Sequence, residues 1–130
     1  MKKACIILVS WFVFTGINPV KANEHAHFCV VKLTEEQKIN LLIEYVKNLK
    51  DAVFIRNGSE HTAEEAAEHL AMKRKKAGSK VKTAIEFIVH IASKSSMSGK
   101  PYLIKFKDGK TETAQALLAE ELKRIEKSNQ

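Results

Sequence analysis

Hydrophobic residues recur at intervals of three or four in four segments of the chain, as they do along one face of a helix. The first segment shows the pattern most clearly, with apolar side chains at Ile39, Leu42, Ile43, Val46 and Leu49. The first three segments open with a threonine followed three residues later by glutamine or glutamate, a capping box that satisfies backbone N–H groups at a helix start. The spacing therefore predicts four helices, which begin after Thr34, Thr62, Thr83 and Thr113.

Two short segments combine β-branched and aromatic residues between turn residues, a composition typical of strands. The first is Ala52–Arg56, which ends at Asn57-Gly58, and the second is Tyr102–Phe106. A third short strand at Thr111-Glu112 would follow the next turn. We therefore expect a mainly helical α+β fold in the order α-β-α-α-β-(β)-α, with about four helices around a small antiparallel two- or three-stranded sheet in which the first two strands pair.

The helix expected after Thr83 is apolar on nearly every side, which is typical of a helix at the buried centre of a domain. His90 lies in this helix among Ile88, Val89 and Ile91. Because buried polar side chains need partners, we expect His90 to be a hydrogen-bonded core residue.

The first 22 residues have the features of a secretory signal peptide. Two lysines precede an apolar run of eleven residues, Ala4–Phe14, and small residues stand before a cleavage site after Ala22. The run is too short to cross a bilayer, which takes about 20 helical residues. We expect residues 1–22 to be the signal peptide, 23–33 a tail and 34–130 a single globular domain in the periplasm, with no membrane span after cleavage.

Composition and cysteine content limit the classes of protein further. The hydrophobic content of 45% excludes a largely disordered chain. Cleavage would leave Cys29 as the one cysteine, so no internal disulfide can form. It would also remove three lysines and lower the formal net charge from +7 to +4.

Six of the remaining bases lie within residues 73–82, at the end of a predicted helix that begins with glutamates. The helix dipole favours acid at the start of a helix and base at its end. The aromatic residues of the chain lie mostly at apolar positions, where they would not stack on bases, so we do not interpret these cations as a nucleic-acid site. Attraction to an anionic surface stays open as an alternative.

Two histidine patterns suggest a metal. If cleavage falls after Ala22, the new terminus Asn23-Glu24-His25 supplies an amine, amides and an imidazole that can bind Cu(II) or Ni(II). His61, Glu65 and His69 are spaced by four, but eight residues of helix rise about 12 Å, so His61 and His69 reach one ion only if His61 precedes the helix. The capping box also employs Glu65, and we predict neither a metal site here nor a cofactor.

The turn after the first predicted strand is a candidate anion pocket. Arg56 stands at the strand end beside Asn57-Gly58 and a helix start, where guanidinium and backbone N–H groups can bind a carboxylate or phosphate. In the alternative interpretation Asn57-Gly58 is only a turn, and Arg56 pairs with an acidic neighbour.

The serine-rich segment 93–101 fits neither a P-loop nor a Ser-x-x-Lys motif. A nucleophile at Ser98 or Ser96 with His61 as its base can be drawn, because catalytic triads are defined in space. No spacing in the sequence supports such a triad.

Two polar blocks carry a resemblance to a known family. They read Phe54-Ile55-Arg56-Asn57-Gly58-x-x-His61-Thr62-x-x-Glu65-Ala66-x-x-His69-Leu70-x-x-Lys73 and Ala92-Ser93-x-Ser95-Ser96-x-Ser98-Gly99-Lys100-Pro101-Tyr102. With them the chain resembles the YfeK-like family of small bacterial periplasmic proteins, a domain of unknown function. The resemblance implies a periplasmic location and no particular activity. It marks as candidate ligand-binding residues Arg56, Asn57, His61, Glu65, His69, Ser95, Ser96, Ser98 and Lys100.

We interpret the chain as a non-catalytic periplasmic binding or interaction module with a polar, anion-accepting site. Its partner would be an anionic small molecule, a glycan or a periplasmic protein. One alternative is a small hydrolase that uses Ser98 or His61, and another is a tail that binds Cu(II) or Ni(II).

Overall fold

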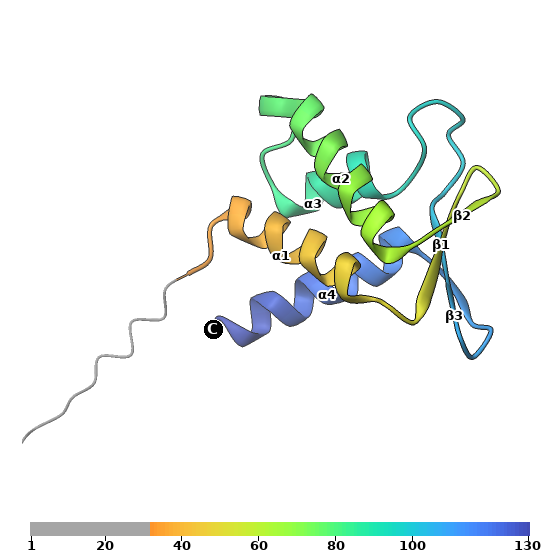
Figure 1. Cartoon of the computed structure of the whole chain (residues 1–130). Helices are drawn as coiled ribbons and strands as arrows, with labels where there is room; N and C mark the ends of the chain where they lie inside the picture. The colour runs from red at the N-terminus through yellow and green to blue at the C-terminus, as the bar shows by residue number, and fades with distance from the viewer. Residues whose placement is uncertain (1–31) are drawn as a thin grey trace, which may run out of the picture.

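The computed structural model describes residues 32–130 of the chain. The expected signal peptide and the tail up to residue 31, with Cys29 and the proposed metal-binding terminus at Asn23, Glu24 and His25, lie outside the described residues. The helices are α1 (Glu35–Asn48), α2 (Ala63–Ala77), the short η1 (Gly78–Lys80), α3 (Ala84–Glu86), its π-helical continuation η2 (Phe87–Ala92) and α4 (Ala114–Ser128). The strands are β1 (Ala52–Arg56), β2 (Ser59–His61), β3 (Leu103–Phe106) and β4 (Thr111–Thr113). The mainly helical α+β fold is confirmed (Figure 1).

The helix starts lie where the sequence predicts them. At Thr34, Thr62 and Thr83 the threonine side chain accepts from the backbone N–H three residues on, and the glutamine or glutamate there accepts from the threonine N–H. Thr113 caps α4 through its side chain alone. These caps fix where each helix begins, because they satisfy N–H groups that have no partner within the helix.

The sheet is antiparallel, with the strand order β2-β1-β3-β4. β1 pairs with β3 as predicted, with Ala52 opposite Phe106 and Ile55 opposite Leu103, and the third strand β4 also forms. The predicted order is wrong at one point, because β2 was missed and the sheet has four strands. Asn57 and Gly58 have φ of 53° and 84°, the left-handed values of a two-residue hairpin turn that folds β2 back on β1.

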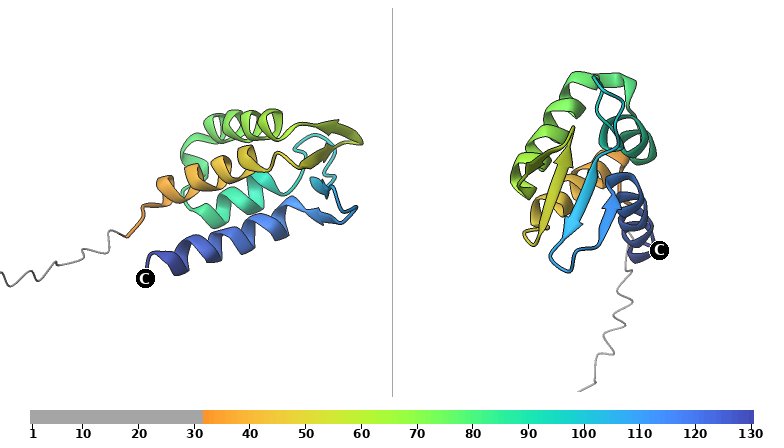
Figure 2. Two further views of the ribbon diagram at one scale, coloured as in Figure 1. Left: turned by 60° about the horizontal axis from the view of Figure 1, so that its bottom comes forward. Right: turned by 90° about the vertical axis from the view of Figure 1, so that its right-hand side faces the viewer.

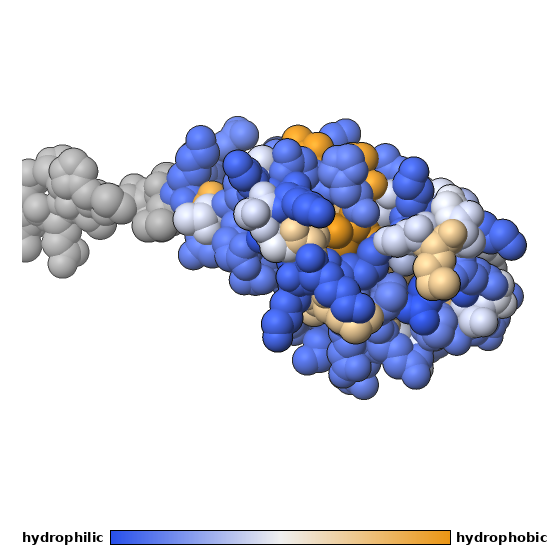
Figure 3. All heavy atoms as spheres, turned by 90° about the horizontal axis from the view of Figure 1, so that it is seen from above, coloured by the Kyte–Doolittle hydropathy of each residue, from blue (hydrophilic) through white to orange (hydrophobic). Residues whose placement is uncertain are grey.

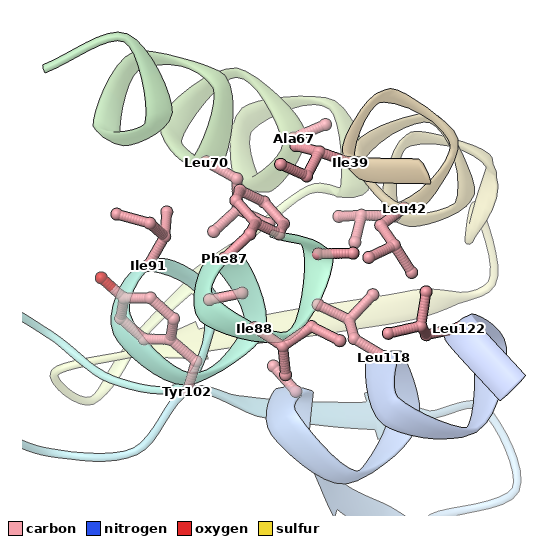
Figure 4. Packing of buried hydrophobic residues seen from close by; sticks show 14 of the residues in the cluster. Ile39, Leu42, Ala67, Leu70, Phe87, Ile88, Ile91, Tyr102, Leu118 and Leu122 are labelled. Atoms are coloured by element: carbon pink, nitrogen blue, oxygen red, sulfur yellow. The ribbon is translucent and has the colours of Figure 1, made fainter. Parts of the chain in front are cut away.

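The helices pack beside one another, and the sheet lies at one end of them (Figures 1 and 2). The fully buried side chains come from several elements, with Ile39 and Leu42 on α1, Phe87 on η2, Ile104 on β3 and Leu118 on α4. The Phe87 ring of η2 points toward Leu70 of α2, and this contact joins η2 to the other helices (Figure 4). Within residues 32–130 no helix is both long enough and apolar enough to cross a membrane.

The prediction for His90 is wrong, because its side chain is exposed. Ile85 and Val89 on the same helical segment are 64% and 40% exposed, so the segment is not buried on every side. Phe87, Ile88 and Ile91 form its core face. An apolar residue can stand at the surface, so apolar neighbours in the sequence did not determine which side His90 faces.

Candidate functional site

The two polar blocks of the sequence meet where the β1–β2 turn touches the loop between η2 and β3. The Asn57 side chain donates from Nδ2 to Ser95 Oγ (3.3 Å) and accepts at Oδ1 from the Ser98 hydroxyl (2.5 Å). This contact follows from the pairing of β1 with β3, which brings the end of one strand beside the start of the other. One amide side chain thus holds the hairpin turn against the loop.

The loop has a defined structure of its own. Ser95 is buried, and its Oγ accepts from the backbone N–H groups of Met97 and Ser98. Its backbone N–H donates to Lys100 O, and its carbonyl accepts from Gly99, whose φ of 70° closes the turn. Ser95 and Ser98 are therefore engaged in holding the loop through their side-chain oxygens.

Lys73 anchors this loop to α2. Its ammonium donates to Ile91 O (2.6 Å), Lys94 O (3.0 Å) and Tyr102 Oη (3.3 Å), and it lies 5.1 Å from the centre of the Tyr102 ring. An ammonium has three donors, so these bonds use all of them. Burial, and to a lesser extent the Arg56 guanidinium, lowers the pKa of Lys73.

An open cleft of about 350 Å³ lies between α2 and the loop. Its α2 wall is a single helix face, since His69, Met72, Lys73 and Lys76 are spaced by three and four residues. The remaining wall is formed by Arg56, Asn57, Ser95, Ser96, Met97 and Tyr102. The cleft therefore combines cationic, hydroxyl and thioether groups and contains no carboxylate.

The positive charge of Arg56 is not balanced by any acidic side chain of the cleft. Arg56 is half-buried and forms no hydrogen bond or ion pair with any other residue of 32–130. The alternative in which Arg56 pairs with an acidic neighbour therefore finds no partner in the described part of the chain. The guanidinium is close enough to lower the pKa of both His69 and Lys73 by charge repulsion.

His69 joins α2 to the start of β3. Its Nε2 lies 3.3 Å from Tyr102 Oη, and the two rings meet edge to face. Burial is the largest cause that lowers the pKa of His69, followed by the positive charges of Arg56 and Lys73. The imidazole is therefore held in its neutral form at neutral pH.

Four of the predicted site residues do not line the cleft: His61, Glu65, Ser98 and Lys100. His61 is on β2, where its Nδ1 is 3.7 Å from Glu65 Oε2, and Glu65 also accepts from the Thr62 N–H as the capping box requires. The exposed Lys100 side chain does not line the cleft. No group of three His, Cys, Asp or Glu residues within 32–130 is placed to hold a metal ion.

His61 instead lines a small, mostly apolar cavity of about 30 Å³ behind the cleft. Its Nε2 is buried and has no hydrogen-bond partner among the described residues. Arg56, His69 and Tyr102 line both the cavity and the cleft, so these three side chains separate the two spaces.

Sequence reasoning missed five residues that line the cleft: Met72, Lys73, Lys76, Met97 and Tyr102. Lys76 had been interpreted only as a charge favoured by the helix dipole. The spacing of residues 69, 72, 73 and 76 could have placed Met72 and Lys76 on the helix face of His69. Nothing in the sequence places Met97, because the loop's internal hydrogen bonds determine its position.

The described part of the chain is thus a small α+β domain with a cationic cleft where a hairpin, a helix and a serine-rich loop meet. Residues 33–126 match a family of unknown function (DUF5329), and the chain belongs to this family, which confirms the resemblance found in the sequence. The chain is 40% identical over 84 residues to the uncharacterized protein YfeK of Salmonella typhimurium, a match of 65% of this chain. The match spans 64% of that relative's length. No solved structure matches the chain.

We expect Lys73→Met to lower the free energy of unfolding by about 1–3 kcal/mol, because it removes all three hydrogen bonds of the ammonium while keeping the length of the side chain. Lys75→Met, an exposed position on the same helix, should change it by less than about 0.5 kcal/mol. Urea denaturation of both variants measures the difference. Equal stability of the two variants would show that the ammonium does not anchor the loop.

The lowered pKa of His69 predicts a loss of stability in mild acid. An unfolded histidine has a pKa of about 6.5, so the folded state binds fewer protons below that pH. The stability that neutral His69 contributes is complete above about pH 6.5 and is lost as the pH falls through the folded pKa.

The unfolding free energy measured from pH 7.5 to pH 5 should therefore decline less steeply in His69→Gln than in the parent protein. His90→Gln replaces an exposed histidine and should retain the parent's slope. The lowered pKa values of Glu35 and Glu86 act in a separate window below about pH 4.5. A parallel decline in the parent and in His69→Gln would contradict the assignment.

Proposed function

We propose that the protein is a non-catalytic periplasmic binding module whose cleft accepts an anionic group. The observation that carries this proposal is the half-buried Arg56 guanidinium, which has no counterion among the described residues. Guanidinium groups bind carboxylates and phosphates through two parallel hydrogen bonds, and a partly desolvated site strengthens such contacts. Arg56 is therefore the primary contact of the anion.

The charges around Arg56 support an anion rather than a neutral ligand. The cleft is lined by three cations, Arg56, Lys73 and Lys76, and by no carboxylate. Burial is the largest cause that lowers the pKa of Lys73 and of His69, and repulsion from Arg56 adds to it; an anion at Arg56 would relieve this repulsion. Lys76 and the exposed Ser96 also line the cleft without hydrogen-bond partners in residues 32–130 and would complete the anion's contacts.

Binding is favoured over hydrolysis by the surroundings of Ser98. Its hydroxyl donates to the amide oxygen of Asn57, which is not a base that can take up a proton, and its Oγ accepts from the Lys100 N–H. His61, the proposed base, lines neither the cleft nor this loop. The hydrolase alternative stays a prediction without a geometric observation in its favour.

A titration with sodium phosphate and with sodium acetate at constant ionic strength tests the site. Two-dimensional NMR should show shifts of the Arg56 side-chain N–H and the Ser96 amide, with a dissociation constant on the order of millimolar for these minimal anions. We expect Arg56→Gln to weaken binding at least about tenfold, which corresponds to the loss of one charged hydrogen-bond pair.

Lys75→Gln removes the same charge from the exposed side of α2 and is the matched control. It should leave both titrations close to those of the parent protein, since Lys75 does not line the cleft. Equal weakening in both variants would mean that the anions respond to net charge alone, and the proposed site would then be wrong.

The periplasmic location rests on the composition of residues 1–22 and on the residue types around Ala22. When the full sequence is expressed in a Gram-negative host, we expect the protein in the periplasmic fraction, with Asn23 as its first residue. N-terminal sequencing after fractionation measures both. An uncleaved protein retained in the cytoplasm would contradict this part of the proposal.

A further inference from the structure

The cleft exposes two methionines beside its cationic groups. Met97 is 97% exposed and Met72 is 45% exposed, and both line the cleft that contains Arg56. The face that shows α2 and the loop is otherwise mostly hydrophilic, with small and separate hydrophobic patches (Figure 3). A single exposed apolar residue needs no explanation, but two of the five exposed large hydrophobics of residues 32–130 share one cleft with an uncompensated arginine.

The loop holds Met97 in this exposed position. The Met97 backbone N–H donates to the buried Ser95 Oγ, and Ser95 is in turn bonded to Asn57 of the hairpin. Met72 is held by α2, on the same helix face as Lys76. The two thioethers are therefore presented by fixed backbone, whereas their unbranched side chains can adapt to ligands of different shape.

We propose that the anion bound in the cleft is amphiphilic, with a carboxylate or phosphate head at Arg56 and Lys76 and an aliphatic chain against Met72 and Met97. This inference rests on the function proposed above and names the class of its ligand. The chain lies along the methionines because the cavity behind Arg56 has only about 30 Å³ and cannot hold an aliphatic chain. The cleft itself, at about 350 Å³, has room for a head group and the first few methylenes.

Octanoate, acetate and octan-1-ol, each kept below its solubility or micelle limit, separate the contributions of head and chain. Isothermal titration at fixed ionic strength should show octanoate binding roughly tenfold more tightly than acetate. Each methylene removed from water contributes a factor of about four, and the open cleft covers the equivalent of about two of them. Octan-1-ol, which lacks the charge, should bind at least about tenfold more weakly than octanoate.

Met97→Ser should weaken octanoate binding roughly fourfold and leave acetate binding unchanged. The side chain is almost fully exposed, so this variant should fold as the parent does. Ile85→Ser is the matched control, because Ile85 is 64% exposed and does not line the cleft. It should leave both affinities unchanged.

The outcomes distinguish this inference from the function on which it rests. If acetate and octanoate bind with equal affinity and both depend on Arg56, the inference of an amphiphilic ligand is wrong, but the anion site stands. Binding of neither anion would overturn both. Binding to vesicles of anionic phospholipid that depends on Met97, without binding of monomeric octanoate, would assign this face to a membrane surface and overturn the inference.

Discussion

The Lys73 ammonium fixes the geometry on which the cleft depends. It satisfies the carbonyls of Ile91 and Lys94 at the end of η2, where a helix carries partial negative charge, and also contacts the Tyr102 hydroxyl before β3. Three parts of the chain are thereby joined by one side chain from α2. The serine-rich loop begins and ends beside this cation. Both ends of the loop are therefore held in fixed positions.

This arrangement places a second cation close to Arg56 and offers no acid to balance the pair. Besides burial, repulsion from the nearby Arg56 guanidinium lowers the pKa of Lys73. Five other cations in residues 32–130 pair with acids, as Lys38 does with Glu35 and Glu126, whereas exposed lysines such as Lys75 and Lys76 have no such pair. Arg56 differs from these lysines because it is half-buried, and a partly desolvated charge without a protein partner is typical of a functional site.

The sequence predicted the features that depend on local chemistry. The capping boxes located the helix starts, and β-branched content located β1 and β3, because both effects act within a few residues. β2 was missed although Asn57-Gly58 is a strong hairpin turn, since Ser59–His61 has no apolar alternation of its own. Lys73 illustrates the limit most clearly, because its role depends on carbonyls 18 and 21 residues away that no spacing identifies.

The fold leaves some of the predicted polar site residues accessible to a ligand and engages others in contacts within the protein. Ser95 and Ser98 resemble catalytic serines by composition, but their hydroxyls join the loop to Asn57 and to its own backbone. A hydroxyl becomes a nucleophile only when a base can take its proton, and an amide oxygen cannot do so. Arg56 has the opposite character, since the fold brings it to a cleft and leaves its donors without acceptors among the described residues. A ligand binds most readily to groups that the protein has not already engaged, and by this criterion the accessible chemistry of the cleft lies with its cations, its thioethers and Ser96 rather than with Ser95 and Ser98.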